Sequence, residues 1–158
     1  MFKTINMKNL IAICSCLLFT LTLSFAQAPK KIAVIESQYN KLTAAEKYVI
    51  VDKGTEAPHK GTYTYNKAKG TYYCKRCNAP LFRSETKFES GTGWPSFDDE
   101  IKGSVKRITD SDGMRTEIVC KNCKAHLGHV FLGEAYTPKS TRHCVNSISL
   151  TFIPYKKK

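Results

Sequence analysis

Two copies of one short cysteine motif constrain this chain more than any other feature. The segments "YCKRCNAPL" at residues 73–81 and "VCKNCKAHL" at residues 119–127 share the pattern C-K-x-C-x-A-x-L. A C-x-x-C on a tight turn holds two thiolates on one side, and two such turns can close a tetrahedron around one Zn²⁺. We interpret the repeat as two similar loops that bind one structural zinc ion, with structural disulfides or redox-active dithiols as alternatives. The four predicted ligands are Cys74, Cys77, Cys120 and Cys123.

The first 26 residues have the pattern of an export leader and not of a folded element. Two lysines precede a long apolar run, and Ser24 and Ala26 are small residues of the kind that a signal-peptide cleavage site requires. We therefore predict a cleaved signal peptide at residues 1–26, export to the periplasm, and a mobile segment at residues 27–40. A start at Met7 would give a shorter leader of the same kind. An uncleaved leader would instead anchor the chain in a membrane.

The formal net charge of +12 makes nucleic acid a partner to consider. The lysines are scattered instead of grouped, apart from the run Lys156, Lys157 and Lys158 at the C-terminus. An exported protein does not ordinarily meet nucleic acid, so we expect no nucleic-acid partner. A zinc-stabilised basic binding module without catalysis is the alternative interpretation of the whole chain.

One short helix is predicted before the first cysteine motif. Thr43, followed by Glu46 three residues later, is a capping box, in which each side chain bonds the backbone N–H of the other residue. The pattern predicts a helix over residues 44–52, with Gly54 placed to end it.

The chain beyond Gly54 has the composition of short β-strands. Runs rich in Tyr, Phe, Val, Ile and Thr alternate with turn residues, and Asp112 with Gly113 forms the centre of a hairpin turn. No apolar pattern of useful length with helical spacing follows residue 54, so this part is predicted to be mostly β. The strands are expected at residues 61–65, 70–74, 102–109, 114–120, 128–132 and 146–154.

Loss of the leader would leave five cysteines, of which Cys144 alone lies outside the repeated motif. It occurs in "STRHCVNSIS" at residues 140–149, which has the character of a strand. Because side chains alternate along a strand, Arg142, Cys144 and Asn146 are predicted to share one face. A cation beside a thiol favours the reactive thiolate, so this cluster indicates a nucleophile, with a buried structural cysteine as the alternative.

Two further segments carry candidate site residues. "AHLGHVF" places His126 and His129 three residues apart, where they could be acid–base groups or spare metal ligands. "FESGTGWPSF" at residues 88–97 holds Trp94, the only tryptophan, next to Pro95 and after two glycines. This tryptophan is predicted to be the wall of an apolar pocket or a structural core residue.

Together these segments resemble the methionine-R-sulfoxide reductase B family, also called the SelR domain. The resemblance runs from Lys41 to Pro154 through "KLT", "GTYYCKRCNAPLF", "TKFESGTGWPSF", "RTEIVCKNCKAHLGHVF" and "RHCVNSISLTFIP", in the family's order. It implies a mostly β fold of the β-tent type, with two antiparallel sheets, one or two short N-terminal helices and a four-cysteine site for structural zinc. The reductase domain would occupy residues 41–158 and act as a monomer.

By this resemblance the chain is an oxidoreductase that reduces methionine sulfoxide, either free or in oxidised proteins. The thiolate of Cys144 would attack the sulfoxide sulfur and become a sulfenic acid, while His129 protonates the departing oxygen. The other residues implied by the resemblance are His126, Arg142 and Asn146 around the nucleophile, and Trp94 and Phe131 at the substrate.

Two departures from the family's pattern change these expectations. Many members have a resolving cysteine between the two glycines before Trp94, where this chain has Thr92. We therefore expect an external thiol, such as a thioredoxin-like protein, to reduce the sulfenic acid. Acidic residues often follow "HVF" in the family, whereas this chain continues with "LGEA", so that Glu134 is displaced. The sequence thus leaves open which acidic residue partners the catalytic histidine.

Overall fold

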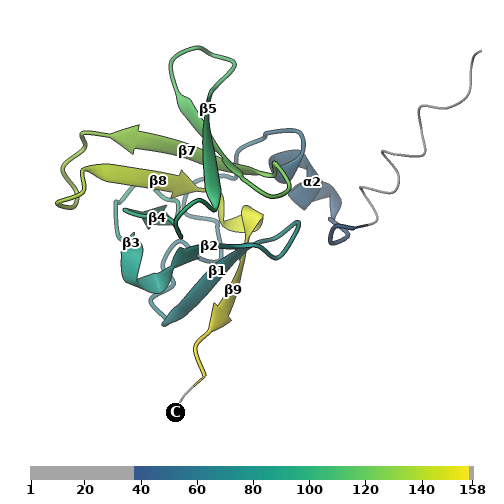
Figure 1. Ribbon diagram of the computed structural model, residues 1–158, viewed down its shortest axis with the longest axis horizontal. Helices are drawn as coiled ribbons and strands as arrows, with labels where there is room; N and C mark the ends of the chain where they lie inside the picture. The colour runs from purple at the N-terminus through teal and green to yellow at the C-terminus, as the bar shows by residue number, and fades with distance from the viewer. Residues whose placement is uncertain (1–37, 157–158) are drawn as a thin grey trace, which may run out of the picture. The chain divides into compact units, whose positions relative to one another are not determined.

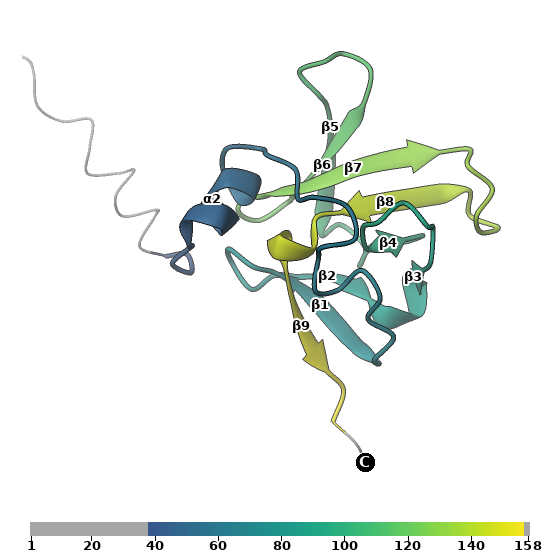
Figure 2. The same ribbon diagram turned by 180° about the vertical axis from the view of Figure 1, so that it is seen from behind.

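The computed structural model describes residues 38–156, drawn from two opposite sides in Figure 1 and Figure 2. The predicted signal peptide at residues 1–26 and positions 27–37 of the predicted mobile segment lie outside the described residues. Within the described chain, no helix has the length and apolar character needed to span a bilayer. In chain order the elements are α2 (Ala44–Ile50), β1 (Gly70–Cys74), β2 (Pro80–Arg83), the 3₁₀ turn η2 (Ser84–Thr86), β3 (Lys87–Phe88), β4 (Ser96–Phe97), β5 (Val105–Thr109), β6 (Thr116–Cys120), β7 (His126–Leu132), β8 (Thr141–Val145), the 3₁₀ turn η3 (Ser147–Ser149) and β9 (Leu150–Pro154).

The strands form two antiparallel sheets. One sheet has six strands in the order β3-β4-β8-β7-β6-β5, and the other has three in the order β2-β1-β9. Helix α2 packs against η3 and β7, and so lies beside the six-stranded sheet (Figure 2). These sheets, with one short α-helix among residues 38–156, confirm the predicted mostly β fold class.

An aromatic core joins the two sheets. Tyr72 on β1 meets Phe97 on β4 edge-on, with 5.0 Å between ring centroids, and Phe82 on β2 stacks on Phe97 at 4.4 Å. All three side chains are fully buried. Such pairs contribute roughly 0.5–1.5 kcal/mol each beyond the area that they bury. The core therefore fixes β4, whose neighbour in the sheet is β8, the strand that carries Cys144.

Helix α2 begins as the sequence predicts. Thr43 and Glu46 form the capping box, because each side chain accepts a hydrogen bond from the backbone N–H of the other residue. The helix ends at Ile50, two residues before the predicted end. Gly54 closes the end of the helix as predicted, because its N–H donates to the Tyr48 carbonyl at 2.9 Å, and a Cβ there would lie 2.3 Å from a ring carbon of Tyr48. The close approach of the Tyr48 ring favours glycine at this position.

The packed structure begins slightly before residue 41, the predicted start of the domain. The guanidinium of Arg76 lies over the ring of Tyr39, 4.6 Å from its centroid, and the Asn40 amide donates a hydrogen bond to the Lys75 carbonyl at 2.7 Å. Both partners belong to the first cysteine loop, so the end of the predicted mobile segment is held by that loop.

The predicted strand at residues 61–65 is wrong, because this segment forms turns. The Thr64 N–H donates to the Gly61 carbonyl at 3.1 Å, and the Tyr63 N–H donates to the Ser147 hydroxyl at 2.7 Å. Tyr63 packs edge-on against the aromatic core. The tyrosines that suggested a strand thus belong to a loop that covers the core.

The other predicted strands are present with changed ends. Strand β1 has its predicted bounds, whereas β5 and β6 begin later and β7 begins earlier than predicted. Residues 147–149 of the predicted last strand form η3 before β9 starts. The sequence did not indicate β2, β3 or β4, which have only two to four residues each and therefore show no alternating pattern.

Candidate active site and metal centre

The two cysteine loops share one backbone conformation. In the first loop, the Cys74 N–H donates to the Ala79 carbonyl at 2.8 Å, and the Asn78 N–H donates to the Cys74 carbonyl at 2.9 Å. The residue after the second cysteine has a positive φ in each loop, 60° at Asn78 and 63° at Lys124. The second loop repeats both hydrogen bonds, from Cys120 to Ala125 and from Lys124 to Cys120, each at 2.9 Å. The sequence repeat therefore corresponds to a structural repeat.

The four thiol groups of these loops converge on one point. Their sulfur atoms all lie within 4.8 Å of one another. The sulfurs of Cys74 and Cys123 are 3.6 Å apart, as are those of Cys77 and Cys120. A disulfide bond is about 2.05 Å long, whereas sulfurs bound at about 2.3 Å to a tetrahedral Zn²⁺ lie roughly 3.8 Å from one another. The spacing fits one four-coordinate metal ion and does not fit disulfides.

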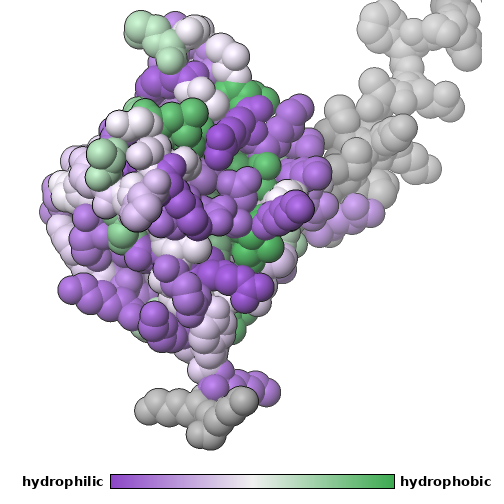
Figure 3. Space-filling view, turned by 60° about the vertical axis from the view of Figure 1, so that its left-hand side comes forward, coloured by the Kyte–Doolittle hydropathy of each residue, from purple (hydrophilic) through white to green (hydrophobic). Residues whose placement is uncertain are grey.

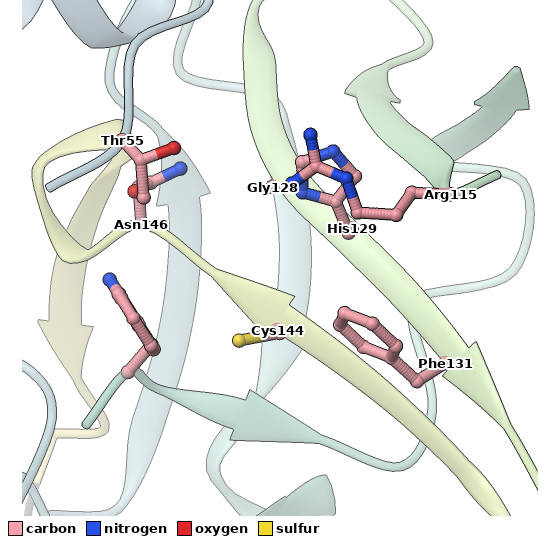
Figure 4. A pocket seen from close by; sticks show the side chains of 8 residues that line it. Thr55, Arg115, Gly128, His129, Phe131, Cys144 and Asn146 are labelled. Atoms are coloured by element: carbon pink, nitrogen blue, oxygen red, sulfur yellow. The ribbon is translucent and has the colours of Figure 1, made fainter. Parts of the chain in front are cut away.

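The thiol of Cys144 lies apart from this centre, in a pocket beside β7 and β8. Its sulfur points into the pocket and away from the ring of Phe131, which lines the same pocket together with His129 (Figure 4). The thiol is partly buried. The structure therefore brings the predicted nucleophile together with most of the predicted site residues. The pocket is lined by the predicted residues Trp94, His129, Phe131 and Asn146, and also by Thr55 and Arg115, which the sequence analysis did not single out.

Arg142 is held beside Cys144 by two interactions. Its guanidinium lies 4.4 Å from the centroid of the Phe131 ring and makes two hydrogen bonds to the Glu134 carboxylate, at 2.6 and 2.9 Å. Burial raises the pKa of the Cys144 thiol, whereas the charge of Arg142 and the hydroxyl of Thr92 act in the opposite direction. Arg142 thus favours the thiolate in a pocket whose burial disfavours it.

A β-bulge brings His126 and His129 to the same face of β7. The register between β6 and β7 shifts by one residue here, and the two imidazole rings lie 5.7 Å apart. Gly128 has a φ of 147°, and a Cβ there would lie 2.0 Å from the Cys144 carbonyl oxygen. Glycine is therefore required at Gly128 for β7 to approach β8 with His129 directed into the pocket.

The acidic partner of His129 comes from a different hairpin. Nε2 of His129 lies 2.6 Å from Oδ2 of Asp110, in the turn between β5 and β6. The guanidinium of Arg115 is 3.1 Å from the same carboxylate. The hydrogen bond with His129 holds the pKa of Asp110 below its usual range, so the carboxylate stays charged. Glu134, the displaced acidic residue, pairs with Arg142 instead of with His129.

His126 lies behind His129 and is not among the residues that line the pocket in the described chain. Its Nδ1 is 2.7 Å from the Glu117 carboxylate, which also binds Lys53 at 2.7 Å. Burial lowers the pKa of His126, although Glu117 acts to raise it. His126 is thus a buried residue that packs against His129, and His129 is the histidine that lines the pocket.

A segment that the sequence analysis missed holds two of the pocket residues in place. The indole N–H of Trp94 donates to the Glu56 carbonyl at 2.9 Å, and the Glu56 N–H donates to the side-chain oxygen of Asn146 at 2.9 Å. The Asn146 amide donates in turn to the Leu127 carbonyl at 3.2 Å. Glu56 makes both of these contacts through its main-chain groups. The residue type at this position therefore could not have indicated them.

Comparisons with known proteins agree with this site. A family model described as the SelR domain matches residues 42–154. Peptide methionine sulfoxide reductase B3 of Arabidopsis thaliana is 46% identical over 129 residues, which cover 80% of this chain and 73% of that protein. Its B5 relative in the same plant is 44% identical over 133 residues, with 83% and 96% covered. A peptide methionine sulfoxide reductase of Methanosarcina barkeri is 45% identical over 129 residues, with 79% and 90% covered. The chain therefore belongs to the SelR-domain family, that of the methionine-R-sulfoxide reductases B.

Proposed function

We propose that this chain is an exported enzyme that reduces methionine-R-sulfoxide, free or in oxidised proteins, to methionine. One observation carries the proposal: among residues 38–156, the single thiol outside the metal centre points into a pocket that also holds an aspartate-bound histidine. The apolar rings of Trp94 and Phe131 in the same pocket suit a methyl thioether group. A basic binding module would not need this arrangement. Export rests on the leader pattern of residues 1–26.

In the first step, the Cys144 thiolate attacks the sulfoxide sulfur. His129, held through Nε2 by Asp110, presents its other ring nitrogen to the substrate and gives a proton to the oxygen. The attack joins the two sulfur atoms. The bonds from the substrate's sulfur to its oxygen and to the Cys144 sulfur then break, and the oxygen passes to Cys144 as a hydroxyl group. The substrate sulfur gains two electrons and leaves as methionine, while Cys144 loses two electrons and becomes a sulfenic acid.

In the second step, external thiols restore the enzyme. One thiol condenses with the sulfenic acid, which releases water and forms a mixed disulfide with Cys144. A second thiol then displaces the Cys144 thiolate and leaves with the first thiol as a disulfide. A protein of thioredoxin type carries both thiols and is the reductant that we propose.

The four-cysteine centre would hold a structural Zn²⁺ through Cys74, Cys77, Cys120 and Cys123. A zinc ion with four thiolate ligands has no open position for substrate, so its chemistry is to fix the fold and to protect the thiols. The ion would join the loop after β1 to the loop after β6, one from each sheet.

An assay with both sulfoxide epimers tests the proposal. The purified chain, supplied with dithiothreitol, is expected to reduce the R epimer of methionine sulfoxide and to leave the S epimer unchanged, because separate enzymes act on the two epimers. Chromatography of the methionine formed gives the measurement. Reduction of neither epimer, or of the S epimer alone, would refute the proposed activity.

Replacing Thr92 with cysteine should convert the enzyme to intramolecular resolution. The Thr92 side chain lies within hydrogen-bonding reach of the Cys144 thiol, so a thiol there could condense with the sulfenic acid. After one equivalent of substrate, mass spectrometry should show a 92–144 disulfide in Thr92→Cys. Wild type and the matched Thr92→Ser control should instead show a sulfenic acid that dimedone traps. An internal disulfide at Cys144 in wild type would contradict resolution by an external thiol.

Replacing Asp110 with asparagine should lower kcat by roughly 10- to 100-fold, a part of the contribution usual for a general acid. The carboxylate holds the His129 ring through a 2.6 Å contact with Nε2, and asparagine removes the charge from this contact. Initial rates with the R epimer of methionine sulfoxide at one fixed pH give the measurement. Asp112→Asn is the matched control, because Asp112 lies in the same turn and binds Arg115 but not His129. Equal losses in both variants would assign the effect to the turn and not to the histidine.

A further inference from the structure

We propose that Met114 is itself a substrate site of this enzyme, and that its sulfoxide is reduced in the pocket of a second copy of the chain. This inference rests on the proposed function and adds the chain to its own substrates. The sequence has three methionines, and Met114 is the one within the described residues 38–156.

Met114 is unusually open to solvent. Its relative exposure is 88%, whereas the other exposed large hydrophobic residues of the described chain range from 38% to 64%. Hydrophilic side chains predominate on the face drawn in Figure 3, where hydrophobic groups are exposed in only a few places. Peroxide oxidises an exposed thioether by passing one oxygen atom to the sulfur and leaving as water, which gives both epimers of the sulfoxide.

The turn between β5 and β6 presents this side chain on a fixed backbone. Oδ1 of Asp112 accepts hydrogen bonds from the N–H groups of Met114 at 2.8 Å and Arg115 at 2.9 Å, and Gly113 has a φ of 69°. Figure 1 shows this turn as a loop that extends beyond the neighbouring strands. A projecting turn can enter the pocket of another molecule without unfolding first.

The direction in which this turn presents Met114 favours a reaction between two molecules. Arg115, the next residue, directs its guanidinium toward His129 and lines the chain's own pocket (Figure 4). Met114 faces solvent instead and is not among the residues that line this pocket in the described chain. Transfer to a second copy leaves the turn intact. The oxygen then passes to Cys144 of that copy, and two external thiols remove it as water.

The test uses a substrate copy that cannot reduce itself. Cys144→Ser protein is oxidised with hydrogen peroxide, freed of peroxide, and mixed with wild type and dithiothreitol. Trypsin releases "ITDSDGMR", residues 108–115, which reports Met114 alone. Mass spectrometry should show the oxidised fraction of this peptide falling by about half, because one of the two epimers is reduced.

Two controls separate this inference from the proposed function. Free methionine-R-sulfoxide is assayed with the same wild-type preparation, and fresh Cys144→Ser protein replaces wild type as catalyst in a parallel sample. An unchanged peptide beside active reduction of the free sulfoxide would overturn the inference and leave the function standing. An equal fall with the Cys144→Ser catalyst would also overturn it. If wild type reduces neither substrate, the proposed function fails and the inference with it.

Discussion

Replacing Cys144 with serine is expected to abolish the reduction of methionine-R-sulfoxide, leaving only the slow background reaction of the thiol reductant. In the proposed mechanism the reaction takes two electrons from the sulfur of Cys144, and a serine oxygen cannot be oxidised in that way. A serine hydroxyl is also not ionised at neutral pH, so the attack on the sulfoxide is lost as well. The loss should therefore persist at every pH and with every external thiol.

The measurement is the methionine formed by equal amounts of wild type and variant with the R epimer and dithiothreitol. Cys144 lies outside the metal centre, so the variant should bind as much zinc as wild type and unfold at a similar temperature. Those two properties show that the lost activity is chemical and not a consequence of misfolding. A folded, zinc-loaded Cys144→Ser protein that still turned over at the wild-type rate would remove Cys144 from the mechanism.

The sequence predicts best where local geometry alone decides the outcome. The hydrogen bonds that shape each cysteine loop are made within the repeated motif itself. The repeat therefore predicted two equivalent loops, and the structure has them. The capping box of Thr43 and Glu46 is local in the same sense. Alternation along β8 places Arg142 beside Cys144, and Asn146, directly after the strand, lines the same pocket as Cys144.

The features of the fold and the site that could not be predicted from the sequence depend on contacts between distant segments. Asp110 contacts His129 because β5, β6 and β7 are neighbours in the sheet. The local sequence pattern of each strand does not predict this strand order. The two histidines would lie on opposite faces of a regular strand, and only the bulge at Gly128 brings them together. The false strand at residues 61–65 also depends on a distant contact, because Tyr63 packs against the core from a loop, while Tyr65 is exposed.

Replacing Cys123 with serine should have the largest effect on stability of any single change in the described chain. Structural zinc contributes about 10–16 kcal/mol to small zinc domains, whereas a whole domain is stable by only about 5–15 kcal/mol. Cys123 is buried among the other three cysteines, and the centre joins loops of the two sheets. Loss of one ligand therefore weakens the connection between the sheets. We expect the variant to lose its zinc and to be largely unfolded at 37 °C.

Circular dichroism with temperature and the zinc content of the purified protein give the measurement, and Cys144→Ser is the matched control. Both variants exchange one thiol for a hydroxyl, but only Cys123 belongs to the metal centre. A chelator strong enough to remove zinc should bring wild type to the state of Cys123→Ser, because both treatments break the same connection between the sheets. If Cys123→Ser instead kept one zinc per chain and unfolded at the wild-type temperature, the core of Tyr72, Phe82 and Phe97 would be sufficient to hold the sheets together, and the metal would have no structural role.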